Sequence, residues 1–506
     1  MTYNSILFNT PQPIQEAPVY LSDLNLDQII DAVTASKEEY NLKPFFYTPL
    51  SNADTIYYRH EIMLDMKNET LLRNIRSFAG GMSTIRRYLA LIEKLYYPYH
   101  KEGWILKTID LYCSVMDQFS EDMSRLSLRS RGLRQFKEYL KTYTSSDFFS
   151  TLKEEKDNLK SMLGKVNYSL FIRENHIRVQ RYLGERDYSK EVEETFKKFK
   201  QHNVKDYTAE FTSQQTMDHI EAAILDMVAK LYPETFLELD RFTGQYADFQ
   251  DSGIKTFDRE IQFYLAYLEY IARFTYAGLP FCYPEVSRET REIHCNGGYD
   301  LALAQNLLRE EGNIVSNDFY MNDPERIIIV SGPNQGGKTT FARMFGQLHY
   351  LAALGCPVPG RDAQLYHYDT LFTHFEKEED ITNLRSKLED DLVRIHGILV
   401  QASSDSIIIM NEIFNSTTLH DVLSIGTKVL QQISDLDAFC VWVTFVDEFS
   451  TYNEKTVSMI STVEPDNPAV RTFRIVRKRA DGLAYALSIA EKYDLSYTQL
   501  MERIKP

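Results

Sequence analysis

Hydrophobic residues recur every three or four positions through most of the first 300 residues, a pattern typical of amphipathic helices. The first such run starts near Leu26, after the candidate capping residues Ser22, Asp23 and Asn25. Further helices are predicted at about 69–99, 103–126, 130–143, 146–163, 188–200, 213–247 and 255–277. We therefore expect residues 20–310 to form a mainly helical framework.

One segment inside this framework has a different period. Residues 166–182 alternate between apolar and polar positions on both sides of Arg173-Glu174-Asn175. A period of two is typical of half-buried strands, and a polar triplet between two such runs is typical of a turn. The pattern predicts two short strands inserted between helices.

After about residue 310 the pattern changes again. Apolar runs rich in β-branched residues occur at 326–331, 406–410, 438–444 and 470–476, with helical segments between them. Strands that alternate with helices predict a doubly wound α/β domain, which binds ligands at the carboxyl ends of its strands. The expected fold is multidomain, with a helical domain at residues 1–310 and an α/β domain at 311–506.

Composition and charge narrow the class of protein. A chain of 506 residues is too long for one hydrophobic core. The net charge of −16 argues against a surface coated in basic residues for nucleic acid, although a local basic patch remains compatible with it. Five scattered cysteines without a C-x-x-C pair are typical of free thiols. The sequence has no apolar run of the ~18 residues that a membrane span needs and no visible signal peptide, so we expect a cytoplasmic protein.

The strongest chemical motif follows the first apolar run of the α/β part. Residues 332–339 satisfy G-x-x-x-x-G-K-[ST]. In this motif the glycines let backbone N–H groups cradle phosphates, the lysine reaches the β- and γ-phosphates, and the hydroxyl binds Mg²⁺. The flanking strand and helix are the context that the motif requires, so a chance match in a Gly-rich turn is the weaker interpretation. The candidate nucleotide-binding residues here are Gly332, Pro333, Asn334, Gln335, Gly336, Gly337, Lys338, Thr339 and Thr340.

A second motif follows the apolar run at 406–410, where the polar residues Asn411 and Glu412 end the predicted strand. P-loop ATPases usually carry Asp then Glu at this point; the first orients Mg²⁺ and the second activates the attacking water. Asn411 can accept a hydrogen bond from a metal-bound water but brings no charge. The candidate catalytic residues are therefore Glu412 and Lys338, and the candidate metal ligands are Thr339 and Asn411. The alternative is a core strand that ends in a solvated turn.

With both motifs in place, the chain resembles the MutS-type ATPases of DNA mismatch repair. The loop at 332–340 resembles the family's TGPN-x-GGKST, in which Pro-Asn after the first Gly is distinctive. Met410-Asn411-Glu412-Ile413 resembles its L-D-E-I, and Ile314-Val-Ser-Asn317-Asp318 resembles its apolar-N-D segment. Residues 47–60 resemble the start of its core and lever domain. The resemblance covers roughly residues 20–500, and it is specific in the ATPase part and diffuse in the helical part.

The resemblance implies an architecture and a set of partners. It implies a helical core and lever domain with a clamp-like insertion at about 145–250, followed by an ABC-type P-loop ATPase domain. It implies ATP and Mg²⁺ as cofactors, with Ile314 and Asn317 on the adenine side. It also implies a homodimer in which one subunit completes the site of the other, and DNA recognised by its structure more than by its sequence.

Several positions depart from the family pattern. Asn411 replaces an acid, Phe445 stands where the family has a His, and Phe414-Asn415-Ser416 replace Gly-Arg-Gly. The family's trans-acting serine loop is present only as the segment 382–392, in which Ser386 is the trans-site candidate. The acidic residues around Ser386, from Glu376 to Asp391, are typical of a solvated helix face. Because Asn411 brings no negative charge to the metal site, we expect ATP hydrolysis to be slow.

The ends of the sequence and its basic clusters bear on DNA. The chain starts almost at the core domain, so we expect the mismatch-reading N-terminal domain and a C-terminal nuclease tail to be absent. Phosphate contacts need only local basic clusters. The DNA-contact candidates are Lys197, Lys198 and Lys200, near Lys205, and a second cluster at Arg125, Arg129, Arg131 and Arg134. The alternative for both clusters is ordinary helix surface.

The leading hypothesis is a dimeric MutS-like protein that binds ATP, clamps DNA in repair or recombination, and hydrolyses ATP slowly. One rival is a nucleotide-gated scaffold or clamp with little hydrolysis, which Asn411 and Phe445 favour. A second rival keeps the ATPase and replaces DNA with a protein partner, which the net charge favours.

Overall fold

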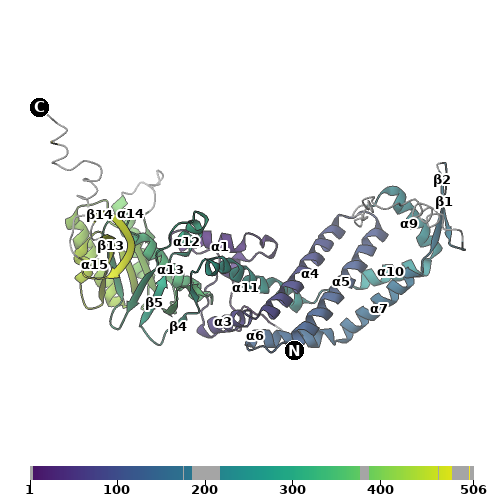
Figure 1. Ribbon diagram of the computed structural model, residues 1–506, viewed down its shortest axis with the longest axis horizontal. Coiled ribbons are helices and arrows are strands. Elements are labelled where there is room, and N and C mark those ends of the chain that lie inside the picture. The colour runs from purple at the N-terminus through teal and green to yellow at the C-terminus, as the bar shows by residue number, and fades with distance from the viewer. Residues whose placement is uncertain are drawn as a thin grey trace, which may run out of the picture. The chain divides into compact units, whose positions relative to one another are not determined.

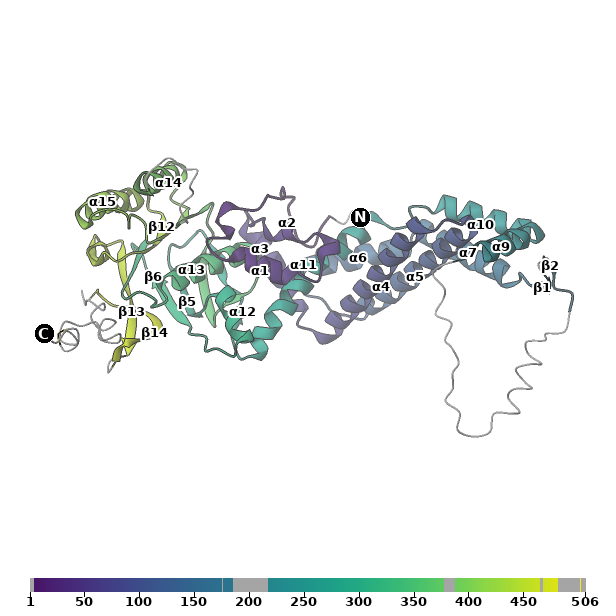
Figure 2. The ribbon, with the colours of Figure 1, turned by 90° about the horizontal axis from the view of Figure 1, so that it is seen from above.

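The computed structural model describes residues 4–174, 176–184, 217–376, 387–464, 467–480 and 501 (Figures 1 and 2). By its internal contacts the chain forms two compact units. Unit 1 contains Asp65–Arg129 and Leu133–Asp258, and unit 2 contains Asn4–Leu64, Ser130–Gly132 and Arg259–Pro506. The predicted domain boundary between residues 310 and 311 stays a prediction.

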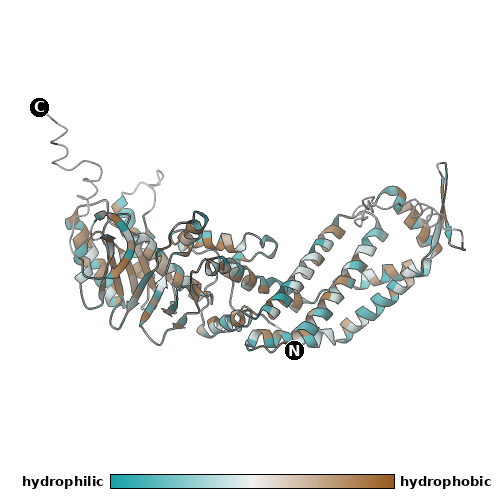
Figure 3. Ribbon diagram, in the orientation of Figure 1, coloured by the Kyte–Doolittle hydropathy of each residue, from teal (hydrophilic) through white to brown (hydrophobic). Residues whose placement is uncertain are grey.

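Unit 1 is built from helices that pack along one another. They are α4 (Glu69–Lys94), α5 (Pro98–Ser124), α6 (Arg131–Thr144), α7 (Asp147–Gly164), α9 (His219–Leu231), α10 (Pro233–Gln245) and the first part of α11 (Ser252–Tyr276). Each carries apolar and polar residues side by side (Figure 3). The Asn68 side chain caps α4 by accepting from the N–H groups of Thr70 and Leu71, and Ser146 caps α7 in the same way. Amphipathic periodicity with local caps explains why α4, α5, α6, α7 and α11 were predictable within a few residues.

The expectation of one helix over 213–247 was wrong. In its described part, α9 ends at Leu231 and α10 begins at Pro233, with Tyr232 between them at φ −127° and ψ 57°. A proline has no N–H to donate and is favoured in the first turn of a helix, so it starts a new helix here. The helix expected at 188–200 lies outside the described residues.

The two short strands expected inside the helical part are confirmed. They are β1 (Tyr168–Arg173) and β2 (His176–Arg181), which pair antiparallel with Arg173 opposite His176. With Arg173 opposite His176, few residues separate the two strands along the chain, and so short a connection fixes the register.

Unit 2 contains a six-stranded sheet in the order β10-β11-β12-β7-β13-β14. Its strands are β7 (Ile327–Ser331), β10 (Leu371–Phe375), β11 (Ile407–Asn411), β12 (Phe439–Val443), β13 (Thr456–Glu464) and β14 (Asn467–Arg477). All neighbours pair in parallel except β13 and β14, which form an antiparallel pair. The apolar runs predicted β7, β11, β12 and β14. They missed β10 and β13, whose polar and apolar residues are mixed.

Helices cover both faces of this sheet (Figure 2). They are α13 (Lys338–Ala353) on one face, and α14 (Lys387–Gln401) and α15 (Leu419–Leu436) on the other. Ile408 and Met410 of β11 pack with α14 and α15, whereas a side chain at Gly346 of α13 would meet Ile409. Successive strand residues point to opposite faces, so a parallel strand buried on both sides needs a continuous apolar run.

A second sheet in unit 2 was not expected. Its order is β4-β9-β5-β6, and a separate pair joins β3 to β8. The strands are β3 (Phe281–Cys282), β4 (Glu285–Ser287), β5 (Ile293–Gly298), β6 (Asn317–Met321), β8 (Val358–Pro359) and β9 (Asp362–Tyr366). Three of them fall inside the region expected to be mainly helical. These three, β3, β4 and β5, are short, and β5 ends in two glycines, so they carry little periodic signal.

The remaining elements of unit 2 are helical. They are η1 (Val19–Leu21), α1 (Leu26–Thr34), η2 (Glu38–Tyr40), α2 (Lys43–Phe46), α3 (Ala53–Asp65), α12 (Leu301–Arg309) and η3 (Asp447–Thr451). Among the described residues, no helix combines the length and the apolar composition that crossing a bilayer requires.

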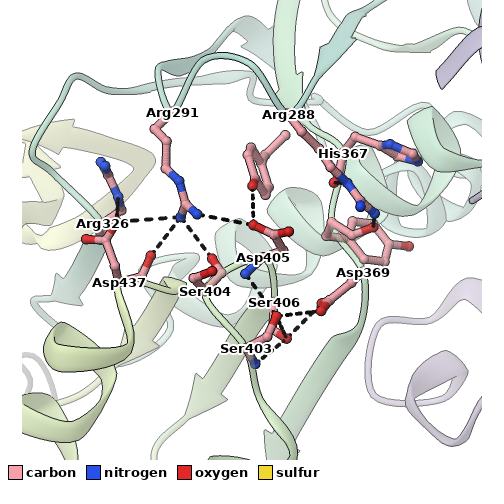
Figure 4. Close-up of polar contacts among 12 residues, drawn as sticks. Arg288, Arg291, Arg326, His367, Asp369, Ser403, Ser404, Asp405, Ser406 and Asp437 are labelled. Atoms are coloured by element: carbon pink, nitrogen blue, oxygen red, sulfur yellow. Dashed lines mark hydrogen bonds and ion pairs between the residues drawn. The ribbon is translucent and has the colours of Figure 1, made fainter. Parts of the chain in front are cut away.

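Polar contacts close the amino ends of the central strands (Figure 4). The Arg291 guanidinium donates to the main-chain oxygens of Ser404 and Asp437 and to the Asp405 carboxylate, at 2.9, 2.8 and 3.2 Å. Arg326 donates from Nε to the Asp437 carboxylate at 3.2 Å. These arginines satisfy the segments that enter β11 and β12, and the opposite ends of the same strands are left for a ligand.

One carboxyl group makes the stability of unit 1 depend on pH. Glu102 of α5 is 9% exposed, and its burial, its hydrogen bond with Asp240 and the charge of Asp240 raise its pKa to about 8. A folded-state pKa above the unfolded value of 4.5 stabilises the fold below pH 4.5, and this contribution is lost as the pH rises through about 8.

We predict that Glu102→Gln, which mimics the protonated acid, raises the melting temperature of unit 1 at pH 8 and flattens its dependence on pH. Thermal unfolding followed by circular dichroism across this range measures both effects. The matched control is Glu154→Gln, which changes an exposed Glu of α7. Parallel curves for wild type and Glu102→Gln would contradict the prediction.

Candidate nucleotide-binding site

The loop between β7 and α13 is shaped by its glycines. Gly332 and Gly337 have φ of 114° and 90°, which is the region that favours glycine. A side chain at Gly332 would come within 3.0 Å of the Ser461 main-chain oxygen, and one at Gly336 within 2.0 Å of Ser461 Oγ. Ser461 Oγ also donates to the Gly336 oxygen at 2.7 Å. The loop therefore packs so closely against Ser461 of β13 that positions 332 and 336 have no room for a side chain.

Lys338 lies at the start of α13, and its side chain is folded onto this loop. Its Nζ donates to the main-chain oxygens of Gly332 and Pro333 at 3.0 and 3.2 Å. The side chain is 4% exposed, and the Nζ lies 3.9 Å from Glu412 Oε1 and 4.6 Å from the centroid of the Phe445 ring. Burial lowers the pKa of Lys338, and the Glu412 charge opposes that shift. The ammonium group of Lys338 thus lies against the main chain of the glycine loop.

The side chains of Thr339, which follows β7, and Asn411, which ends β11, are in contact. The Thr339 hydroxyl donates to Asn411 Oδ1 at 2.9 Å, which joins the first turn of α13 to the last residue of β11. Both oxygens are neutral, and oxygen donors are what Mg²⁺ prefers. In the part of the chain that the structure describes, no three His, Cys, Asp or Glu side chains gather as a metal site. These residues therefore fit a Mg²⁺ ion that arrives with the phosphates of a nucleotide.

Glu412 follows Asn411 in a left-handed conformation, with φ of 52°. Its N–H donates to the Val443 oxygen at 2.9 Å, so the end of β12 fixes its backbone. Burial raises the pKa of the Glu412 carboxyl, the charge of Lys338 lowers it, and the charge of Glu376 raises it; the net shift is upward. A carboxylate with a raised pKa is a better proton acceptor near neutral pH than an ordinary Glu.

A pocket of about 200 Å³ lies between β6 and β14. It is lined by Ser316–Tyr320, Met459 and Arg474–Arg477. The Asn317 side chain, which the family resemblance implies on the adenine side, donates to the Phe473 oxygen at 3.2 Å and accepts from Ile475 N at 2.7 Å. It therefore joins β6 to β14. Ile314 precedes β6 in a loop, half-buried, and is not among the lining residues.

Sequence reasoning missed two residues of this region. Phe473 is 49% exposed and has φ of 58°, and its main chain lies 3.6 Å from the position of a side chain built at Gly337. Ser461 supports the glycine loop from β13. Neither residue belongs to a recognisable motif. Both lie in the β13–β14 hairpin, which contacts the loop although it is more than 120 residues away in the sequence, as the bond from Ser461 Oγ to the Gly336 oxygen shows. The sequence around them carries no signal that would have found them.

The other predicted site residues lie as follows. Pro333 is buried, Asn334 and Gln335 are exposed, Thr340 is half-buried, and Asn334 Oδ1 accepts from Lys338 Nζ at 3.5 Å. The trans-site candidate Ser386 and the DNA-contact candidates Lys197, Lys198 and Lys200 lie outside the described residues.

The second basic cluster is partly neutralised by carboxylates. Arg125 pairs with Glu121, and Arg131 pairs with Asp54 and Glu61 at 2.9 Å. These pairs favour ordinary surface over a phosphate contact for two of its four arginines.

The expectation of a solvated acidic face is wrong for one residue. Asp391 is 7% exposed and lies against His374, with Asp391 Oδ1 2.9 Å from His374 Nε2. The hydrogen-bond partner of Asp391 lies on another element of the fold, which explains why the charge pattern alone misplaced this residue.

Comparison with known proteins places this region in a family. Residues 328–501 match the family described as MutS domain V. The DNA mismatch repair protein MutS of Orientia tsutsugamushi (strain Ikeda) is 26% identical over 215 residues, which cover 42% of this chain and 24% of that protein. The MutS of Halalkalibacterium halodurans is 25% identical, over 40% of this chain and 24% of the relative.

The MutS of Rickettsia rickettsii is 31% identical over 145 residues, which cover 28% of this chain and 16% of that protein. The matched part thus spans about a quarter or less of the length of these curated relatives. The family match begins in β7 and includes the glycine loop, β11 and β12. Residues 328–501 thus carry a MutS domain V, and in this region the chain is similar to DNA mismatch repair MutS proteins.

Proposed function

We propose that the protein binds ATP with Mg²⁺ at the glycine loop, hydrolyses it slowly, and uses the nucleotide to control a clamp on DNA. One observation carries the proposal: Lys338, Thr339, Asn411 and Glu412 converge at the carboxyl ends of β7 and β11. This combination of an anion-binding loop, neutral oxygen donors and one carboxylate is what nucleotide hydrolysis requires.

Phosphate binding would use the loop amides and Lys338. The lysine now donates to two main-chain oxygens of its own loop, and phosphate oxygens are stronger acceptors because they are charged. The N-terminus of α13 adds its unpaired amides and positive dipole end. The exposed Phe473 ring and the pocket beside Asn317 offer an apolar surface and polar groups for the base.

Thr339 and Asn411 would hold Mg²⁺, Thr339 directly and Asn411 through water. A Mg²⁺ ion held there would supply positive charge to offset the charge of the phosphates. Asn411 orients without adding negative charge, so its hold is weaker than that of an aspartate. Glu412 would accept a proton from the attacking water. Its neighbour Phe445 offers only an aromatic face to Lys338, at 4.6 Å, where the family has an imidazole. Both departures support slow turnover.

The Phe445 contact also favours a second candidate function, a nucleotide-gated clamp that barely hydrolyses ATP. An ammonium held over an aromatic face is stabilised by about 0.5–2 kcal/mol. The contact with Phe445 therefore favours one fixed position of the Lys338 side chain. In this alternative, nucleotide binding alone drives the conformational change. The two functions differ in turnover and agree in binding.

The relatives named as DNA mismatch repair proteins support DNA as the partner. We propose that residues 1–310 form a core and lever domain with a clamp-like insertion at about 145–250, and that 311–506 form the ATPase domain. We also propose a homodimer in which Ser386 reaches the partner's nucleotide, recognition of DNA structure more than of sequence, and a cytoplasmic location. A protein partner in place of DNA remains the rival, favoured by the charge of −16.

Removing the lysine ammonium tests the nucleotide site. Lys338→Ala is expected to weaken ATP binding by about tenfold or more, because charge-assisted hydrogen bonds contribute about 1.5–3 kcal/mol. Isothermal titration with ATP and Mg²⁺ measures it. Lys428→Ala, an exposed lysine of α15, is the matched control. Unchanged affinity in Lys338→Ala would refute the site.

Restoring the missing charge tests the explanation for slow turnover. Asn411→Asp is expected to raise the steady-state ATPase rate at saturating Mg²⁺, since the carboxylate would hold the metal more firmly. Asn415→Asp adds the same charge at an exposed position four residues away and is expected to leave the rate unchanged. If Asn411→Asp turns over no faster than wild type, the neutral side chain is not the cause.

Salt dependence separates DNA from a protein partner. If the protein clamps DNA, its affinity for duplex or branched DNA should fall linearly on a log–log plot against salt concentration, because phosphate contacts release counterions. Fluorescence anisotropy with homoduplex, mismatched, single-stranded and branched DNA, each with and without ATP, measures the slope and the preference. Absence of binding to all four at low salt would leave the protein-partner rival standing.

A further inference from the structure

The turn that carries Glu412 is held in a costly conformation. We call residues 411–414 the Glu412 turn. Within it, Glu412 and Phe414 both have positive φ, at 52° and 65°. A residue other than glycine pays about 1–2 kcal/mol in this region. The family pattern has a glycine where this chain has Phe414, so this turn needs support that a glycine would not need.

Part of that support is apolar. The Phe414 ring is fully buried, and it packs with Ile413, Ile395 of α14 and Trp442 of β12 in the cluster beneath α14 and α15. Packing of this kind holds the ring in place. Glu412 N still donates to the Val443 oxygen, but the N–H of Phe414 lies beyond the β11 ladder, which ends at Asn411, and needs a partner elsewhere.

Asp391 supplies one of those partners. Its Oδ2 accepts from Phe414 N at 3.2 Å, and its Oδ1 lies 2.9 Å from Nε2 of the fully buried His374. Asp391 belongs to α14 and His374 to β10, so three separate segments meet at one carboxylate. Both carboxylate oxygens are used, which fixes the orientation of the side chain.

The carboxylate is suited to this task. Burial raises the pKa of Asp391. The hydrogen bond and charge of His374 and the N–H of Phe414 together lower it by more, so the net shift is downward. The group is therefore ionised near neutral pH. Hydrogen bonds to an ionised acceptor are about twice as strong as neutral ones. The bond to Phe414 N is thus strong enough to offset much of the cost of the turn.

We propose that Asp391, oriented by His374, is a positioning residue that fixes the Glu412 turn and so holds the Glu412 carboxylate beside Lys338. This inference rests on the proposed role of Glu412 in hydrolysis. Asp391 touches neither the glycine loop nor Lys338 in any contact of the described residues, so its loss is expected to affect turnover and spare nucleotide binding.

Hydrogen exchange of the turn tests the inference without requiring turnover. In Asp391→Ala, backbone amides in the segment 411–416 are expected to exchange about tenfold faster or more, because a hydrogen bond to a charged group is lost. The segment 332–340 is expected to keep its exchange rates. Asp391→Asn, which retains one acceptor oxygen, is expected to lie between Asp391→Ala and wild type. Glu389→Ala, an exposed carboxylate of the same helix, is the matched control.

Kinetics then separate positioning from general destabilisation. Asp391→Ala is expected to lower kcat about tenfold with little change in KM or in ATP affinity, and Asp391→Asn to recover part of the loss. Exchange in 411–416 that matches Glu389→Ala would overturn the proposal, and so would equal loosening of 332–340. If Asp391→Ala does not fold, Asp391→Asn decides by the same two readouts. A wild type that binds ATP without turnover would refute the hydrolysis proposal, while the exchange data would still decide this one.

Discussion

The parallel register of three strands is the constraint on which the rest of the site depends. Asn411 at the end of β11 lies opposite Val443 of β12, which in turn lies opposite Val330 of β7. Because all three strands run the same way, their carboxyl ends fall at one level. The glycine loop, the Asn411-Glu412 pair and the Thr444-Phe445 segment therefore face one another, although more than 70 residues separate Thr339 from Asn411.

The electrostatics of the site follow from this placement. A buried ammonium is costly unless it has partners, and Lys338 finds them in main-chain oxygens, the Glu412 carboxylate and the Phe445 ring. Of the two polar residues at the end of β11, only Glu412 is acidic, so one carboxylate compensates the positive charge of Lys338. An anionic ligand would complement such a site.

Backbone conformation is the second theme of the site. In the loop at 332–337 the residues with positive φ are Gly332, Gly337 and Gln335, whereas in the Glu412 turn they are Glu412 and Phe414. Glycine adopts this conformation at little cost, and the Glu412 turn, which has no glycine, relies on neighbouring elements. Asp391 and His374 are such neighbours, and their buried pair links α14 and β10 to the residue proposed to activate water.

The sequence by itself determined the local elements. It predicted the amphipathic helices of unit 1, the hairpin at 168–181, the four apolar strands and the glycine loop, because each depends on periodicity, caps or a contiguous motif. It misjudged 213–247, where Pro233 divides the helix, and Asp391, whose partner His374 lies on another element. Only the tertiary structure decided which distant residues meet: the support of the glycine loop by Ser461, the exposed ring of Phe473 and the bond from Phe414 to Asp391. The order of strands in the sheet and the folding of the β13–β14 hairpin bring these groups together. The local sequence around each group does not encode either of these features.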